Sequence, residues 1–139
     1  MTGPAYSTEE MLATMPHAVA LGIALDEADV SAVRGHLDYS PRLTTLGGAM
    51  HGGALMTLAD SVGAVCAFLN LPPDHSTSTL ESKTNFLRGV REGTVRATAR
   101  PLHVGRTSIV VQTDLYDDRG GRVAQTTQTQ AVLPPRSSA

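Results

Sequence analysis

The feature that most constrains the fold is one long run of helix-compatible residues in the middle of the chain, from Ala54 to Leu69. Pro72 and Pro73 follow this run and end it, because proline lacks the backbone N–H that a continuing helix would need. The run is apolar on almost every face, which is typical of a helix buried inside a protein. The sequence therefore predicts one buried central helix, and the remaining segments must supply the layer that covers it.

The chain after this helix becomes rich in Thr and Val, with stretches of period-two alternation that are typical of β-strands. Turn signals over residues 89–93 and 117–121 divide it, and Pro101 indicates a bulge or a sheet edge within its strand. The pattern predicts four strands, over residues 79–88, 94–104, 107–117 and 122–133. We expect these consecutive strands to form an antiparallel meander.

The segment before the helix contains shorter elements. Ser7 to Glu10 has the capping-box pattern that opens a helix, and we expect Pro16 to close that short helix. Residues 30–39 alternate in part and predict a strand, and residues 41–50 predict a loop. One sheet wrapped around one apolar helix is an α+β arrangement. Because so few helices leave the outer face of the sheet uncovered, we expect a partner subunit.

Length and charge restrict the class of protein. The 139 residues suit a single domain, with residues 1–20 as an N-terminal helical segment and residues 134–139 as a flexible tail. A formal net charge of -2 excludes the basic surface that nucleic-acid binding requires, and no basic amphipathic helix indicates membrane binding. Without a signal-peptide pattern or an apolar run of transmembrane length, the expected compartment is the cytoplasm.

A glycine pair and a carboxylate mark the region of the central helix. Gly52 and Gly53 precede it, where open backbone N–H groups and the positive helix end can hold a developing oxyanion. The alternative is a pair that only lets the chain turn. Asp60 lies about two turns further on, on a face shared with Thr57 and Ser61. It is either a base or nucleophile with a raised pKa, or a charge that polar partners from the sheet satisfy.

The sequence predicts neither a metal site nor a cofactor. The five histidines share no metal-binding spacing such as H-x-x-x-H. The G-x-S-x-G motif of serine hydrolases is absent, and so are the glycine patterns of phosphate-binding loops and dinucleotide sites. The single cysteine, Cys66, lies in an apolar run, and we expect a buried, unreactive thiol.

Three motifs occur in one order along the chain. They are Gly48-x-x-His51-Gly52-Gly53 followed by Asp60, then Thr79-Leu80-Glu81-Ser82-Lys83-Thr84-Asn85-Phe86-Leu87-Arg88, then His103-Val104-Gly105-Arg106-Thr107. In this order they resemble the phenylacetate-pathway type (PaaI-like) of hotdog-fold acyl-CoA thioesterases. The resemblance covers residues 21–133, which is nearly the whole chain.

The resemblance implies a fold and an activity. The fold is the hotdog, a curved antiparallel sheet wrapped around one long helix, assembled as a homodimer or homotetramer with composite active sites. The activity is hydrolysis of an acyl-CoA thioester to free acid and CoA, with no metal or other cofactor. Aromatic acyl groups are among the candidate substrates, and Gly63 and Ala64 near Asp60 indicate room for a bulky group.

The resemblance also implies roles for single residues. The Gly52 N–H would polarise the thioester carbonyl, His51 would shape that loop, and Asp60 of the facing subunit would act as base or nucleophile. Thr79 matches a position where a hydroxyl lies near the attacking water. A further set would face the CoA moiety: Arg88, Gly105, Arg106 and Thr107. The alternative for the two arginines is that they are ordinary surface charges.

Thr45 departs from the family pattern, which has Asn or Gln six residues before the histidine. A threonine hydroxyl offers fewer hydrogen bonds than an amide, so the positioning of substrate or water by this residue is open. A non-catalytic acyl-CoA-binding hotdog protein is one alternative. An enoyl-CoA hydratase is another, although His51 precedes the helix instead of following Asp60 within it, which disfavours that chemistry.

Overall fold

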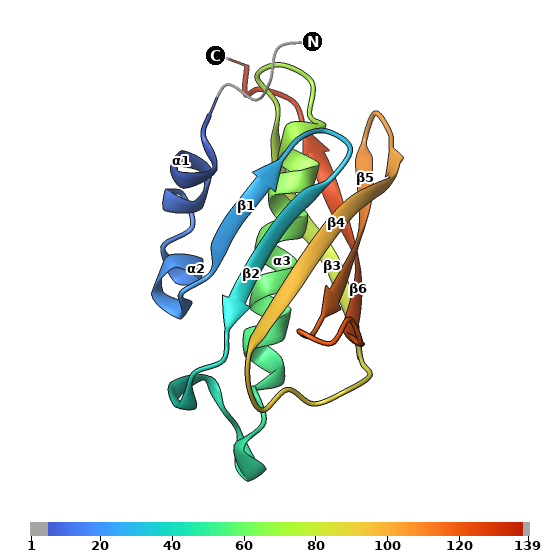
Figure 1. Ribbon diagram of the computed structural model, residues 1–139. Helices are drawn as coiled ribbons and strands as arrows, with labels where there is room; N and C mark the ends of the chain where they lie inside the picture. The colour runs from blue at the N-terminus through green and yellow to red at the C-terminus, as the bar shows by residue number, and fades with distance from the viewer. Residues whose placement is uncertain (1–5, 138–139) are drawn as a thin grey trace.

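The computed structural model describes residues 6–137 and shows one long helix lying against a curved sheet, with two short helices beside it (Figure 1). The helices are α1 (Thr8–Ala13), α2 (Pro16–Leu21) and α3 (Gly52–Leu69), and short 3-10 turns cover Pro41–Leu43 and Leu46–Gly48. The predicted segment 1–20 and tail 134–139 lie partly outside the described residues. Within the tail, residues 134–137 form neither helix nor strand.

The N-terminal segment forms two helices where the sequence predicted one. The Ser7 Oγ accepts the Glu10 N–H at 3.1 Å and the Glu10 Oε2 accepts the Ser7 N–H at 2.7 Å, which confirms the capping box. The expectation that Pro16 only closes this helix is wrong, because Pro16 opens α2. A first-turn position needs no N–H donor and matches the fixed φ of proline.

All six strands within residues 6–137 belong to one antiparallel sheet with the order β1-β2-β4-β5-β6-β3. They are β1 (Ala24–Ala28), β2 (Val33–Asp38), β3 (Ser76–Phe86), β4 (Thr94–Val104), β5 (Ser108–Tyr116) and β6 (Arg122–Leu133). The sequence does not predict β1, whose five residues include a single buried one. The predicted irregularity at Pro101 is confirmed, because the β4–β5 register shifts between Pro101 and His103.

The position of β3 corrects the predicted four-strand meander. β4, β5 and β6 do form a meander, but β3 pairs with β6 at the sheet edge farthest from β1. The connection that follows β3 passes the start of α3, where the Val90 carbonyl accepts the Met50 N–H at 2.7 Å. Alternation identifies a strand but does not encode which neighbour it pairs with, so this part of the prediction is wrong.

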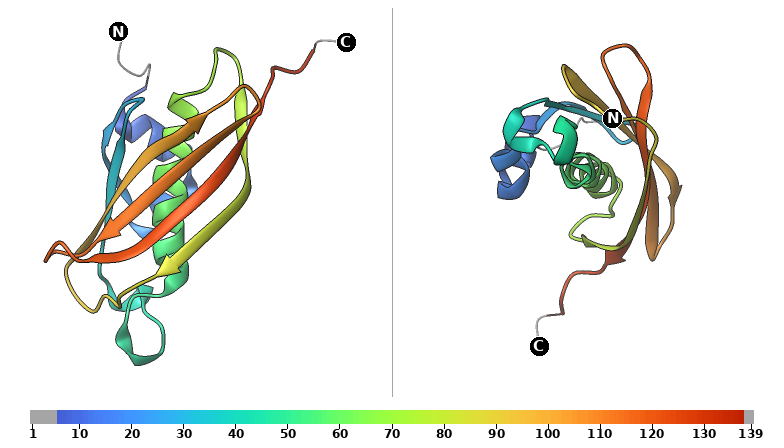
Figure 2. Two further views of the ribbon diagram at one scale, coloured as in Figure 1. Left: turned by 90° about the vertical axis from the view of Figure 1, so that its right-hand side faces the viewer. Right: turned by 90° about the horizontal axis from the view of Figure 1, so that it is seen from below.

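α3 lies in the hollow of the curved sheet, as the view from below shows (Figure 2). Its Leu58, Val62 and Cys66 are fully buried in the core, so the hotdog arrangement is confirmed. The helix begins at Gly52, two residues before the predicted start. By length and composition α3 could cross a membrane, but 56% of this span is buried in the protein, so it serves here as the core helix.

The inner face of the sheet has an apolar half and a polar half. Under β2, β4 and β5 the inward side chains are mainly aliphatic and fully buried, such as Leu37, Val95 and Val111. β6 carries Thr126, Gln128 and Gln130 at the equivalent positions, each at most 1% exposed. The side of the sheet next to the β3 edge therefore holds buried hydrogen-bonding groups under α3.

Candidate active site

His51 builds the start of α3. Its side chain caps the helix, because its Nδ1 accepts the Gly53 N–H at 2.8 Å. Its carbonyl oxygen also accepts the N–H groups of Ala54 and Leu55. Since Nδ1 is an acceptor, the ring proton belongs on Nε2. The Gly53 N–H is therefore engaged by His51 and is not free to bind a substrate.

Gly52 contributes the open N–H group of this turn. The first residue of a helix has no acceptor for its N–H within the helix, and no other hydrogen bond found across residues 6–137 uses this group. The ring of Phe86, at the end of β3, lies beside Gly52, where an added Cβ would be 3.2 Å from the Phe86 Cζ. Together with the positive helix end, this N–H can stabilise a developing oxyanion.

Thr45 lies on the exposed loop that leads to this turn. Its N–H donates to the Ala49 carbonyl at 2.9 Å and its carbonyl accepts the Gly48 N–H at 3.1 Å. The neighbouring Leu46 is 99% exposed. In the part of the chain that the structure describes, the Thr45 hydroxyl has no hydrogen-bond partner, so its role stays a prediction.

Asp60 lies on the exposed face of α3 in the single chain, although the sequence predicts that this helix is buried. It faces a groove of about 480 Å³ that extends across α3 from Met15 and His17 to Ser82 on β3. Desolvation raises the pKa of the Asp60 carboxyl above its ordinary value, and a hydrogen bond from Gln128 lowers it in part. A carboxylate with a raised pKa in a groove is suited to act as a base or nucleophile.

Gln128 of β6 reaches Asp60 from beneath the helix. Its Nε2 donates to the Asp60 Oδ1 at 3.3 Å, and the side chain is fully buried. Gly63 supplies the space, because a Cβ at Gly63 would collide with the Gln128 Oε1. The suggestion that Gly63 makes room for the acyl group is therefore wrong, since the Gln128 amide already fills that volume.

Thr79 has a similar partner further along β3. The Gln130 Nε2 donates to the Thr79 Oγ1 at 2.9 Å, and the Gln130 Oε1 accepts from the Thr77 Oγ1 at 3.2 Å. Because the Thr79 oxygen accepts this bond, its own proton is free to donate elsewhere. The β3 residue that lines the Asp60 groove is Ser82, about 10 Å along the strand from Thr79.

Gly52 and Asp60 are too far apart to act on one carbonyl within a single chain. Eight helical residues place them about 12 Å apart along the axis. On β3, Phe86 lies beside Gly52 and Ser82 lies beside Asp60, which repeats this separation on the sheet. The Gly52 N–H and the Asp60 carboxylate are thus two separate groups on a single chain, and we call them the two half-sites of the candidate site.

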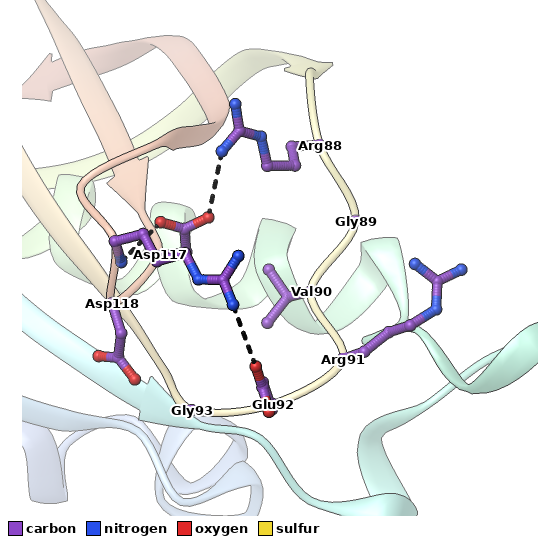
Figure 3. Close-up of a pocket in the computed structure, with 9 residues that line it drawn as sticks. Arg88, Gly89, Val90, Arg91, Glu92, Gly93, Asp117 and Asp118 are labelled. Atoms are coloured by element: carbon purple, nitrogen blue, oxygen red, sulfur yellow. Dashed lines mark hydrogen bonds and ion pairs between the residues drawn. The ribbon is translucent and has the colours of Figure 1, made fainter.

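Arg88 lines a hollow of about 490 Å³ at the end of the sheet where α3 begins. Its guanidinium points toward Asp117 (Figure 3), with 3.6 Å between the Arg88 Nη1 and the Asp117 Oδ2. Arg119 lies 4.0 Å from Glu92 in the same hollow, whereas Arg91 points away from Asp117. The acidic side chains offset the positive charge of two of the three arginines.

The Gly105–Thr107 turn lies at the opposite end of the sheet from Arg88. Strand register places Phe86 opposite Ala124 at one end of β6, while Ser108 pairs with Ala131 near the other end. These two ends are roughly 25 Å apart at the usual rise per strand residue. One chain therefore does not bring Arg88 and Arg106 to the same end of a CoA molecule.

Two other kinds of chemistry find little support in the described residues. No group of three His, Cys, Asp or Glu side chains within residues 6–137 could hold a metal ion. Cys66 is fully buried, and burial, with a smaller effect from Asp29, raises the pKa of its thiol to about 11. A thiol with that pKa stays protonated at neutral pH and is a poor nucleophile.

Sequence reasoning did not single out Gln128, Gln130, Ser82 or Phe86. A signal for the two glutamines was present, because residues 125–130 form a strand segment without one apolar side chain. A strand between two others that is polar on both faces departs from ordinary core patterning. For Ser82 and Phe86 there was no such signal, since their roles follow from which strand lies beside α3.

Comparison with known proteins agrees with this geometry. The thioesterase superfamily profile matches residues 47–124. The chain is 36% identical over 117 residues to the putative esterase ComA2 of Bacillus subtilis, covering 82% of this chain and 91% of that protein. It is also 36% identical over 86 residues to 1,4-dihydroxy-2-naphthoyl-CoA hydrolase of Escherichia coli, covering 62% of this chain and 63% of that enzyme. The match thus spans less than two thirds of the Escherichia coli enzyme.

A solved structure extends the likeness to the fold. A mutant of thioesterase PA1618 from Pseudomonas aeruginosa matches with a TM-score of 0.88 and 30% sequence identity, covering 94% of this chain and 96% of that one. The superfamily profile covers the loop before α3, α3 itself and the strands up to β6. Those segments contain both half-sites, Gly52 and Asp60. The chain is therefore a hotdog-fold thioester hydrolase that belongs to the thioesterase superfamily.

Proposed function

We propose that this enzyme hydrolyses an acyl-CoA whose acyl group is aromatic or similarly bulky, with Asp60 as the catalytic carboxylate. The observation that carries the proposal is Asp60 itself, a carboxylate of raised pKa that faces a groove of about 480 Å³ on α3. The name of the Escherichia coli relative, a hydrolase of an aromatic acyl-CoA, supports the substrate class. The cytoplasm stays the predicted compartment.

The proposed mechanism needs one N–H donor, one carboxylate and water. The Gly52 N–H donates to the thioester carbonyl oxygen and stabilises the negative charge that develops there. Asp60 then follows one of two routes. As a base it removes a proton from the water that attacks the carbonyl carbon; as a nucleophile it forms an anhydride that water cleaves. Either route releases the carboxylic acid and the CoA thiol.

The two half-sites are proposed to meet in a homodimer. β3 is an edge strand of eleven residues, most of them exposed, and such an edge is a template for pairing with another strand. Antiparallel pairing with the partner's β3 reverses the strand direction. With the two-fold axis near Thr84, midway between Ser82 and Phe86, Asp60 of one chain would approach the partner's Gly52. Further association of two such dimers would give a tetramer.

The acyl group is proposed to lie along the exposed face of α3. A second hollow, of about 550 Å³, continues from the Asp60 groove, and both are lined by Met15. Its walls include Ala64 and Phe68 of α3 and Tyr6 from the N-terminal segment. Ala64 is one turn beyond Asp60, so a small side chain leaves room directly beside the reacting carbonyl. Apolar and aromatic walls suit a bulky apolar acyl group.

The CoA moiety is proposed to use both arginine regions, each from a different chain. Arg88 lies near Gly52 in one chain, and an antiparallel dimer brings the partner's Arg106 turn toward the same end. The backbone of that turn is fixed, because the Gly105 N–H donates to the Ser108 carbonyl and the Thr107 carbonyl accepts the Val132 N–H. The exposed Arg106 side chain is therefore presented on a rigid turn, where it can pair with phosphate.

The hydratase alternative has little support from the site. That chemistry requires an acid and a base side chain acting together on one substrate. His51 instead uses its Nδ1 to cap α3 and lies nine residues before Asp60. Within residues 6–137, His17 of α2 is the one other titratable side chain that lines the Asp60 groove.

The proposal is tested with a panel of aromatic and aliphatic acyl-CoA esters, with release of free thiol as the readout. Saturable turnover that is highest for an aromatic or branched acyl group is the expected result. Turnover confined to short linear acyl groups would contradict the substrate class. Binding of several acyl-CoA esters without any thiol release would contradict the hydrolase assignment and favour the non-catalytic alternative.

A further inference from the structure

The contact between Gln128 and Asp60 is unusual for a protein core. Gln128 is fully buried between β6 and α3, yet of its two polar atoms only Nε2 has a partner, the Asp60 Oδ1 at 3.3 Å. The Oε1 has no hydrogen-bond partner among the described residues. A buried polar atom without a partner destabilises the folded state, so an apolar side chain of similar volume would suit this position better on stability alone.

Two further residues are arranged around the same amide. Gly63 carries no side chain where a Cβ would collide with the Gln128 Oε1, and the Oγ1 of Thr113 would lie 3.2 Å from that Cβ. The Thr113 Oγ1 is also buried without a partner. A glycine in the middle of α3 carries its own cost to helix stability. Gln128, Thr113 and Gly63 therefore each lower the stability of the fold, and all three lie around the amide beneath Asp60.

We infer that Gln128 is a positioning residue that holds the Asp60 carboxylate in its reactive orientation through the Nε2–Oδ1 hydrogen bond. The inference rests on the proposed function, because it assigns Gln128 a role through Asp60. The bond engages one lone pair of Oδ1 and restrains rotation of the carboxylate. Oδ2 is then directed toward the groove and the water or thioester. A misplacement of about 1 Å at such a site costs on the order of 100-fold in rate.

The charge around Asp60 makes this role measurable. Desolvation raises the pKa of Asp60, and the Gln128 hydrogen bond opposes that rise. Loss of the donor should therefore raise the pKa further. Among the described residues, His17 is the one other titratable side chain that lines this groove between α2, α3 and β3. If Asp60 acts unprotonated, the acidic limb of the pH–rate profile should move to higher pH when Gln128 is replaced.

The chain contains a matched control on the same strand. The Gln125 Nε2 donates to the Asp114 Oδ1 at 2.8 Å, so this pair is also a glutamine amide on a carboxylate. Gln125 lies an odd number of residues from Gln128, and successive side chains of a strand point to opposite faces. This control pair therefore lies on the outer face of the sheet, away from α3. Gln125→Met removes the same kind of bond without touching Asp60.

The test compares Gln128→Met with Gln125→Met. Gln128→Met should lower kcat about 10- to 100-fold with little change in KM. Gln128→Met should also move the acidic limb of the pH–rate profile to higher pH. The melting temperature should be equal to that of the wild type or higher, because the unpaired Oε1 is gone. In an Asp60→Asn background, Gln128→Met should cause no further loss, since coupled positions are non-additive. Gln125→Met should leave kcat and the pH profile as in the wild type.

A normal kcat and an unmoved acidic limb in folded Gln128→Met would overturn the inference, and so would a loss of kcat that is fully additive with Asp60→Asn.

A measurement on the wild type covers the case in which the variant does not fold. The side-chain amide resonances of Gln128 should titrate with the apparent pKa of the acidic limb. A Gln128 amide that does not respond to pH while the enzyme remains an active, Asp60-dependent thioesterase would refute the inference alone. Loss of Asp60 dependence would instead refute the proposed function.

Discussion

The two halves of the inner sheet face lie under the same helix but are built from different side chains. Under β2, β4 and β5, aliphatic residues such as Leu115 and Val111 are fully buried and give the fold its stability. Under the β6 side, Gln128 and Gln130 are equally buried but hold Asp60 and Thr79 by hydrogen bonds. The buried side chains of the first half pack the core, and we propose that those of the second half orient the reacting groups.

The polar half of the inner sheet face also lies next to an open edge of the sheet. The polar half ends at β3, which is an edge strand with mostly exposed residues. A core made of aliphatic residues is complete within one chain. The polar half instead lies next to a free sheet edge, and the two candidate half-sites along that edge, Gly52 and Asp60, are about 12 Å apart within one chain. Substitutions in the apolar half should consequently lower stability, whereas substitutions in the polar half should lower turnover.

The largest effect is expected for Asp60→Asn. Turnover should fall by about 10²- to 10⁴-fold, the usual scale for loss of a general base, with little change in KM. Because the pKa of Asp60 is raised in the folded state, its ionised form costs stability once the pH exceeds the unfolded value. The neutral Asn variant should therefore be as stable as the wild type at pH 7, or more stable. Thiol release and thermal denaturation measure the two quantities, and near wild-type turnover would remove Asp60 from the mechanism.

Gly52→Pro should be the next most severe change. Proline at the first helical position removes the N–H but fits the helix start, and His51 already has the extended backbone, with φ -60 and ψ 133, that precedes proline. We expect a loss of about 10²- to 10³-fold in kcat, as for removal of an oxyanion donor. Gly52→Ala is the control, since it keeps the N–H. Equal activity of the folded Pro and Ala variants would show that this N–H is not used.

Leu115→Ala tests the apolar half. Leu115 is fully buried on β5, so its truncation should lower the free energy of unfolding by about 2–5 kcal/mol. Turnover per folded molecule should stay close to that of the wild type, because the proposed site lies under β6 and β3. Urea denaturation gives the free energy of unfolding, and assays well below the melting temperature give the turnover. A large fall in kcat without a loss of stability would break the division between the two halves.

The smallest effect is expected at Thr45. The loop is exposed and its hydroxyl has no partner among residues 6–137, so Thr45→Asn should not lower kcat and is expected to raise it modestly, because an amide makes more hydrogen bonds. Thr45→Val is the matched variant without the hydroxyl. A strong loss in the Asn variant beside a normal Val variant would mean that this loop does not lie at the thioester.

The sequence was sufficient for the central helix, the strands β4 and β6, and the resemblance that identified Gly52 and Asp60. Those features depend on local signals, namely an apolar run ended by prolines, alternation and a short motif. It was not sufficient for the place of β3, because strand pairing depends on the whole chain. Ser82 was missed for the same reason, since its relation to α3 exists only once β3 lies beneath that helix. Gln128 and Gln130 did have a local signal, the wholly polar run over residues 125–130, but that run does not reveal which residues of α3 they contact.

Some expectations failed because one residue type suits two environments. Pro16 opens a helix as well as it ends one. Gly63 could have been a gap for substrate, and only the position of Gln128 shows that the gap is filled. Asp60 is exposed in the single chain although the helix around it is apolar. We propose that a subunit partner or an acyl group covers this apolar face.

A composite site requires that the Gly52 N–H of one chain and Asp60 of the other act on one thioester, and mixing two inactive variants tests this requirement. Asp60→Asn and Gly52→Pro chains are mixed, and exchange of their subunits is demonstrated. The resulting heterodimers should have one intact site. Half the dimers would then carry one of two sites, so activity should recover to about a quarter of the wild-type value. Complete absence of recovery, with heterodimers present, would place both groups within one chain and contradict the composite site.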